Sequence, residues 1–265
     1  MKNKVIICFV ILFSVFFLLT GCNSTYQEER YFTEDYRPGM TLKVKNSVGD
    51  IEIRRSPQEN ITILTNIEGY GSSINEAKQI VEKTEIRRDW RGDQLFIDAS
   101  SQNSSFSRGR SVTYTISIPM NFNAEIETST GDIIIEEIEG NVDLETSTGD
   151  IYIESLFGDI KGKTSTGDLI INYFEGEMDI NTSTGDIKIA LYNKANSNNT
   201  LRASTGDIEL AFFEDPSAYF EIRTSTGDIN YFGQNFEDEL QAGRNGSSAF
   251  YNIRTSTGYI YLGYR

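Results

Sequence analysis

The sequence predicts an all-β fold, a parallel β-solenoid of about 18 residues per coil with one short N-terminal amphipathic helix. The first reason is a six-residue segment, Thr146 to Ile151, whose close copies return through the second half of the chain. The second is the spacing of the repeat glycines, which is 18, 18, 18, 21, 21 and 31 residues. A period of this length is typical of a solenoid, in which each turn of chain stacks on the last. The repeat glycines are Gly131, Gly149, Gly167, Gly185, Gly206, Gly227 and Gly258.

Hydrophobic alternation inside each period is the third reason, because it divides the period into two strands. Ile151 and Ile153 follow the repeat glycine Gly149 by two and four places, and Val142 and Leu144 precede the first Thr of that copy in the same rhythm. A second turn falls between the strands at Gly140, Gly158 and Gly176. We therefore expect coils of strand, turn, strand and turn, flattened or right-handed, with equivalent residues of successive coils in register about 4.8 Å apart.

Residues 40–265 should form a single solenoid domain in which leading strands, a helix and a hairpin (40–122) precede the repeat coils (123–265). A degenerate copy of the repeat, Asn46 to Ile51, lies in the leading part. Ser73 and Glu76 have the spacing of a capping box, which predicts a helix from Ser73 to about Lys83. Alternating residues on both sides of Gly92 predict a hairpin.

The first 21 residues are typical of an export signal, with a basic start, an apolar run from Val5 to Leu19 and a small-residue end. The segment Leu19-Thr20-Gly21-Cys22 resembles the lipobox of bacterial lipoproteins. That resemblance implies that Cys22 is acylated, for example by palmitate, and becomes the first residue of the mature protein. We expect residues 22–39 to be the lipid anchor and tether, with a first strand near 30–33, on the extracytoplasmic face of the cell membrane.

Charge and residue usage exclude several classes of function. Without Lys2 and Lys4 the chain has 22 basic and 39 acidic residues, a net charge of about −17, which argues against nucleic acid as a partner. The sequence contains no histidine, so histidine-based catalytic triads are excluded. Cys8 lies in the signal segment, which leaves the lipid anchor as the one mature cysteine.

The aspartates that follow the repeat glycines should form a column along one edge of the solenoid. Neighbouring carboxylates about 4.8 Å apart repel by somewhat under 1 kcal/mol in water, so something must offset the repulsion. Ordinary turn chemistry, in which each carboxylate accepts a backbone N–H of its own turn, is the simpler explanation. The alternative is that calcium bridges the column. The candidate ligands are Asp132, Asp150, Asp168, Asp186, Asp207 and Asp228, and Asp50 can extend the column.

Aromatic residues concentrate in the late, longer coils, where insertions at 192–199, 212–217 and 232–248 should form loops on the flank. We expect these aromatic residues to fill and cap the open end of the solenoid. The alternative is a surface for a partner protein or a glycan. Candidate partner-binding residues are Phe212, Phe213, Phe232, Phe236 and Phe250.

The repeated Ser-Thr-Gly-Asp-Ile, the single helix and Ser117-Ile118-Pro119 before the array resemble the putative-adhesin family of bacterial β-strand-repeat domains of unknown function. Within that family the chain is similar to the LiaG-like envelope proteins. The resemblance covers about residues 40–265 and implies a parallel β-solenoid at the cell surface. It brings no catalytic or ligand-binding motif.

These features together predict a non-enzymatic, lipid-anchored surface protein that acts as an adhesin-like or scaffold module of the envelope. Its partner would be another envelope protein or a glycan. The LiaG-like resemblance suggests an alternative, a regulatory partner in envelope-stress signalling. A second alternative is a polysaccharide-cleaving β-helix enzyme, because two stacked aspartates lie close enough for a retaining pair of carboxylates. Repeated, equivalent acids are nevertheless scaffold-like, since an active site needs dissimilar neighbours.

Overall fold

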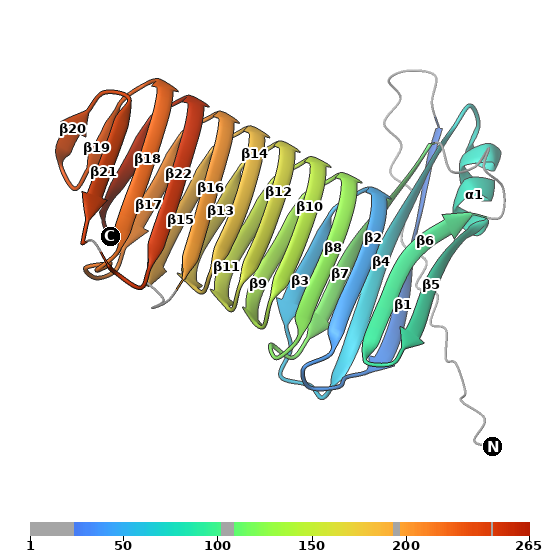
Figure 1. The fold of residues 1–265 in the computed structure, drawn as a ribbon. Helices are drawn as coiled ribbons and strands as arrows, with labels where there is room; N and C mark the ends of the chain where they lie inside the picture. The colour runs from blue at the N-terminus through green and yellow to red at the C-terminus, as the bar shows by residue number, and fades with distance from the viewer. Residues whose placement is uncertain (1–23, 102–108, 193–196, 245) are drawn as a thin grey trace.

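A computed structural model describes residues 24–101, 109–192, 197–244 and 246–265. Two long sheets face each other across one core and form a flattened solenoid (Figure 1), which confirms the predicted fold class. Sheet A has 12 strands and sheet B has 11. The predicted signal segment and Cys22 lie outside the described residues, and within those ranges no helix is long and apolar enough to span a membrane.

In spatial order, sheet A consists of β1 (Ser24–Asp35), β4 (Asn60–Gly71), β7 (Arg110–Ile118), β3 (Ile51–Arg55), β9 (Ile133–Glu139), β11 (Ile151–Phe157), β13 (Leu169–Glu175), β15 (Ile187–Tyr192), β17 (Ile208–Phe212), β23 (Ile260–Tyr264), β19 (Ile229–Tyr231) and β20 (Gln234–Phe236). Sheet B consists of β21 (Glu239–Gly243), β18 (Tyr219–Thr226), β22 (Phe250–Thr257), β16 (Asn198–Thr205), β14 (Met178–Thr184), β12 (Ile160–Thr166), β10 (Val142–Thr148), β8 (Asn123–Thr130), β2 (Thr41–Val48), β6 (Gln94–Ser101) and β5 (Thr84–Arg91).

The repeat coils stack in parallel and in register, as predicted. Val142 pairs with Ile160 in sheet B, and Ile151 pairs with Leu169 in sheet A. These side chains point inward and are buried, while their immediate neighbours along each strand face outward. The core is therefore made of columns of aliphatic side chains, one from each coil.

Glycine is required at the corner that joins each sheet B strand to the next sheet A strand. The seven repeat glycines have φ between +138° and +149°, a region that residues with a side chain rarely adopt. A Cβ added to any of them would lie 2.0–2.3 Å from the carbonyl oxygen of the corner glycine in a neighbouring coil. The corners can thus stack at strand spacing only if this column carries no side chains.

Buried threonine hydroxyls close the same corner. Thr146 donates to the carbonyl of Gly131 at 3.2 Å, and Thr164 donates to that of Gly149 at 3.2 Å. Each hydroxyl therefore links its strand to a corner carbonyl of the preceding coil.

The last coil of the chain is not the last coil in space. β22 lies between β16 and β18 (Figure 1), and β23 pairs with β17 on one side and β19 on the other, so the final coil is inserted between two earlier ones. Similarly, the first coil, β2 and β3, lies between β6–β7 and β8–β9. Our expectation that successive coils are neighbours holds from β8 to β17 and is wrong at both ends, because insertions there let the chain step over one coil position.

The N-terminal end is closed by antiparallel strands and a helix. Helix α1 (Ile74–Glu82) begins after Ser73, whose hydroxyl accepts the N–H of Glu76, as predicted. β5 and β6 form the predicted hairpin. Residues 24–35, expected to belong to a tether with a first strand near 30–33, form the longer strand β1, which pairs antiparallel with β4 along its whole length. Arg30 explains this docking, because its guanidinium donates to the carbonyls of Val81 and Thr84 at the end of the helix.

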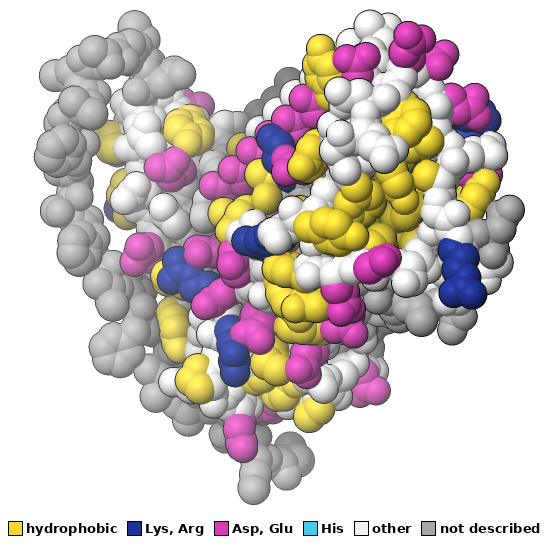
Figure 2. Space-filling view, turned by 90° about the vertical axis from the view of Figure 1, so that its left-hand side faces the viewer, with side chains coloured by type: hydrophobic (Ala, Val, Ile, Leu, Met, Phe, Trp, Pro, Cys, Tyr) yellow, Lys and Arg dark blue, Asp and Glu magenta, His cyan; other side chains and the backbone are white. Residues whose placement is uncertain are grey.

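The C-terminal end is closed by the insertion at 232–248. β20 pairs antiparallel with β19, and β21 pairs antiparallel with β18, so the segment covers the outer edges of both sheets. It was predicted to be a flank loop, and the structure shows that it is mainly an end cap. Figure 2 looks onto this end, where hydrophobic side chains gather among acidic and neutral ones.

Alanine substitutions can separate the two reasons for glycine at the corner, which are the positive φ and the close approach of a neighbouring backbone. A hairpin glycine, Gly92, and a glycine of the second turn, Gly176, each show one of them. Gly92→Ala meets only the positive φ, because nothing lies within 4 Å of its added Cβ. Gly176→Ala meets mainly the clash, since its Cβ would lie 1.9 Å from the carbonyl oxygen of Gly158. We expect Gly92→Ala to cost about 1 kcal/mol of unfolding free energy and Gly176→Ala about 1–3 kcal/mol.

Gly167→Ala faces both demands and should cost about 3 kcal/mol or more, as measured by urea unfolding. Equal losses for Gly167→Ala and Gly92→Ala would contradict the stacking constraint.

Candidate functional site

The predicted aspartate column exists along the glycine corner. The Oδ1 atoms of Asp50 and of five of the six candidates each accept the backbone N–H of the equivalent residue in the next coil, at 2.7–2.9 Å. We expected the acceptor contact to lie within the same turn, and the structure shows that it links neighbouring coils instead. The ladder runs through Asp50, Asp132, Asp150, Asp168, Asp186 and Asp207, and it ends on the N–H of Tyr259.

The inserted coil separates Asp228 from the other candidates. Tyr259 occupies the corner position between Asp207 and Asp228, because its coil lies between theirs. Burial raises the pKa of Asp186, but the N–H of Asp207 and the ammonium of Lys188 outweigh it and leave that pKa lowered. At Asp186, the backbone and lysine contacts thus favour the charged carboxylate.

Among the described residues, no group of three or more acidic or cysteine side chains is placed to hold a metal ion. One carboxylate per coil, committed to a backbone N–H through one oxygen, offers fewer ligands than the six to eight oxygens that calcium takes. The geometry therefore favours the structural explanation of the column over calcium.

Replacing Asp150 tests this role. Asp150→Asn keeps a side-chain oxygen that can accept the N–H of Asp168 and removes one repelling charge, so its melting temperature should equal or exceed that of the wild type. Asp150→Ala removes the acceptor and should cost about 1 kcal/mol. For each of the three proteins, the midpoint of thermal unfolding in calcium should equal its own midpoint in a chelator. A calcium-dependent midpoint in the wild type that is absent from Asp150→Asn would contradict the structural role.

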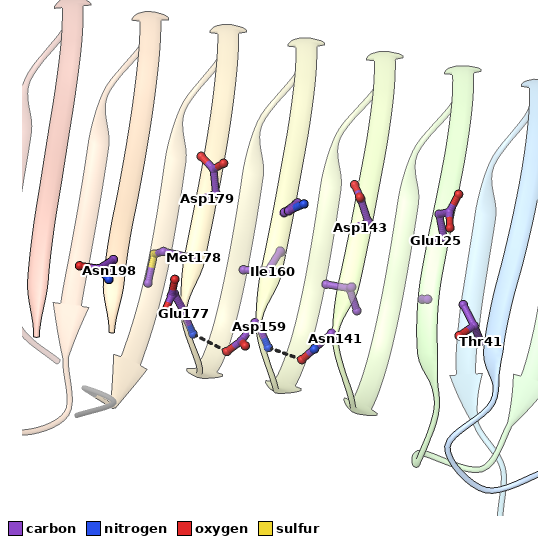
Figure 3. Close-up of a pocket in the computed structure, with 13 residues that line it drawn as sticks. Thr41, Glu125, Asn141, Asp143, Asp159, Ile160, Glu177, Met178, Asp179 and Asn198 are labelled. Atoms are coloured by element: carbon purple, nitrogen blue, oxygen red, sulfur yellow. Dashed lines mark hydrogen bonds between the residues drawn. The ribbon is translucent and has the colours of Figure 1, made fainter. Parts of the chain in front are cut away.

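The opposite corner carries a second ladder that the sequence analysis missed. Asn123, Asn141 and Asp159 each accept the N–H of the equivalent residue one coil later, at 2.9 Å, and Figure 3 shows two of these bonds. The signal was present in the residues after the second corner glycines, Asn141, Asp159 and Glu177. The polar residues of this ladder occupy the same position in successive coils and are committed to backbone N–H groups, as expected of a scaffold.

The structure separates the five aromatic candidates. Phe212 is fully buried and packs on Phe220 and Tyr251. It therefore belongs to the core, and the prediction that it binds a partner is wrong. Phe232 and Phe236 pack against the core at the capped end. Phe250 stacks on Tyr219, and Phe213 stacks on Tyr192 with ring centroids 4.7 Å apart. Of the five, Phe213 belongs to a larger aromatic surface.

That surface is a row of four rings at the ends of the sheet A strands, which we call the aromatic shelf. It consists of Phe157, Tyr173, Tyr192 and Phe213, with successive ring centroids 4.7–5.4 Å apart. Each ring is at least partly exposed. The N–H of Phe213 donates to the carbonyl of Leu191, which fixes the last ring beside its neighbour.

A hollow of about 390 Å³ on the outer face of sheet A adjoins the shelf. Its floor includes Ala190 and Ala211, and Lys188, Glu209 and Tyr261 are among its walls. The hollow exists because the outward position five places after the repeat glycine changes from large to small. That position holds Glu136, Glu154 and Asn172 in early coils and Ala190, Ala211 and Gly263 in β15, β17 and β23.

Arg265 connects the hollow with the shelf. Its guanidinium lies 5.2 Å from the centre of the Phe213 ring and donates to the carbonyl of Asn172. The amide of Asn172 in turn donates to the Tyr152 hydroxyl at 2.6 Å and to Glu154 at 2.8 Å. Hydrogen bonds from Tyr152 and Asn172 lower the pKa of Glu154. The surface thus combines flat apolar rings with fixed polar groups.

Residues 33–262 match the sequence profile of the Toastrack DUF4097 family. Solved structures that the chain resembles include a putative adhesin from Bacteroides fragilis, with 14% identity, a TM-score of 0.44, and 88% of this chain and 96% of that chain covered. Another is a putative cell adhesion protein from Clostridium sporogenes, with 15% identity, a TM-score of 0.33, and 90% and 100% covered. A comparison with curated proteins gave no match. The profile spans most of the chain, so this protein belongs to the Toastrack DUF4097 family, as the resemblance in its repeat implied.

Proposed function

We propose that the protein is a non-enzymatic, adhesin-like binding module of the bacterial envelope, and that the aromatic shelf and its hollow bind carbohydrate. The observation that carries this proposal is the continuity of the four rings with the hollow, through Arg265. The lipobox-like segment supports a location on the outer face of the cell membrane, held by a lipid on Cys22.

Sugars suit the chemistry of this surface. The apolar faces of pyranose rings can pack on aromatic rings, and their hydroxyls can bond the amide, carboxylate and guanidinium groups beside them. The hollow is within the size range of small-ligand sites, and the shelf extends it across several coils. An open surface of this length suits a chain of sugars.

Glu154 does not suit the role of a general acid in glycoside hydrolysis. A general acid needs a raised pKa, whereas hydrogen bonds from Tyr152 and Asn172 lower the pKa of Glu154. Polysaccharide cleavage stays a prediction from the stacked aspartates, and for this surface we propose binding alone. The role in stress signalling stays a prediction from the family resemblance.

Removing two rings of the shelf tests the proposal. The variant Tyr192→Ala/Phe213→Ala should bind at least about tenfold more weakly, because two stacking contacts are lost. Affinity electrophoresis of the full-length protein in neutral detergent, in gels containing mixed-linkage glucan, xylan or mannan, measures this. Tyr31→Ala, on β1, is the control because this tyrosine is also exposed, at 48%. The proposal fails if none of the three polymers retards the wild type, or if the double variant is retarded equally.

The lipid anchor is tested separately. Cys22→Ala should abolish incorporation of labelled palmitate and leave the signal segment uncleaved, because the acylated thiol would be absent. Metabolic labelling and the mass of the purified protein show both effects. Palmitate incorporation that persists in the variant would place the lipid elsewhere.

A further inference from the structure

A groove of about 450 Å³ on the outer face of sheet B is lined by cations, and none of the described residues that line it is acidic. Its four cations are Lys163, Arg202, Arg223 and Arg254. The chain as a whole has 24 basic and 39 acidic residues, so a surface without acids is unusual for it. The groove lies on the opposite sheet from the aromatic shelf, so the two surfaces can be altered independently of each other.

The cations arise from a change at one position of the repeat. The residue four places before the repeat glycine is acidic in the first two copies and arginine in the last three. The neighbouring outward position two places earlier stays acidic or neutral in these last copies, as Thr200, Glu221 and Asn252 show. The change is therefore specific to one row. Along the chain, that row reads Glu127, Glu145, Lys163, Asn181, Arg202, Arg223 and Arg254.

The three arginines lie on adjacent strands of sheet B, and Arg254 of the inserted coil takes the middle place. Arg202 is in register with Arg254, and Arg254 is in register with Arg223. Neighbouring strands are about 4.8 Å apart, so three like charges are held on adjacent strands. Repulsion between these charges lowers the stability of the folded protein, and a bound anion would reduce that repulsion.

Other cations at this position of the repeat, and Arg223 itself, form ion pairs with acidic side chains. Lys45 pairs with Glu127, and Lys163 pairs with Glu145. Arg223 pairs with Glu239 at 2.8 Å on the capping strand β21. Arg202 and Arg254 form no ion pair with any residue in the described part of the chain, although both are exposed. These two guanidinium groups are available to an external anion.

Hydroxyl groups border the arginines. Ser204, Ser225 and Ser256 lie two places after the three arginines, are exposed and line the same groove. A guanidinium presents paired N–H donors that match the oxygens of a phosphate or carboxylate, and serine adds a further donor. We propose that this groove binds a linear anionic polymer through its phosphate or carboxylate groups. The polymer would run along the solenoid axis, because the cations form a row across successive coils.

The test compares three soluble polymers titrated against the full-length protein in neutral detergent. Polygalacturonate supplies carboxylates, poly(glycerol phosphate) supplies phosphates, and dextran is uncharged. We expect one or both polyanions to bind with an affinity that falls as the salt concentration rises. Dextran, which carries no charge, should show no such salt-dependent binding. Comparing the two polyanions identifies which oxyanion the groove prefers.

The variant Arg202→Gln/Arg254→Gln should bind the polyanion at least tenfold more weakly. The control is Arg54→Gln/Arg55→Gln, which makes the same change in net charge on sheet A and should change the affinity less than twofold. Equal affinities for the two variants, or no binding of either polyanion by the wild type, would overturn the proposal. Loss of polyanion binding with neutral-polysaccharide binding retained in the Arg202→Gln/Arg254→Gln variant would confirm that this groove is separate from the shelf.

Discussion

The architecture depends on close stacking of backbone at the glycine corner. Because a Cβ on a corner glycine would approach the carbonyl of the neighbouring coil to 2.0–2.3 Å, every coil must present a bare backbone at the same place. Once that column is bare, the buried threonines and the aspartates can hydrogen-bond from coil to coil. The repeated Thr-Ser-Thr-Gly-Asp segment is thus the corner at which neighbouring coils are linked, and its Thr and Asp side chains hydrogen-bond from one coil to the next.

The inserted last coil contributes residues to both proposed surfaces. β22 places Arg254 between Arg202 and Arg223, and β23 places Tyr261 and Arg265 beside β17, next to the aromatic shelf. With coils stacked in chain order, β17 would instead pair with β19, and Tyr261 and Arg265 would not lie beside the shelf. The regular coils supply a rigid frame, and the inserted coil changes the chemistry of both faces at one end of it.

The sequence was sufficient to predict what repeats. Glycine spacing and alternation predicted two strands per coil, the inward residues and the parallel register, because these depend on contacts that recur in every coil. Coil order could not be predicted, since β22 carries the same inward pattern as β18 and fits either slot. The shelf was also missed, although Phe213 was among the candidates, because Tyr173 and Tyr192 come from different coils and meet only where β13 pairs with β15. Small residues such as Ala190 and Ala211 at an outward position were the available signal for the hollow.

Cysteine cross-linking tests the inserted coil directly, in a chain whose Cys8 and Cys22 are replaced by alanine. Thr200 and Asn252 are register neighbours on β16 and β22, whereas Glu221 on β18 lies one strand beyond. A disulfide needs Cα atoms within about 7 Å, and two strand spacings amount to about 10 Å. The account predicts that the pair Thr200→Cys/Asn252→Cys oxidises readily to an intramolecular disulfide and that Thr200→Cys/Glu221→Cys does not. Ready oxidation of the second pair, with the first remaining reduced, would show that the coils stack in chain order and would contradict the account.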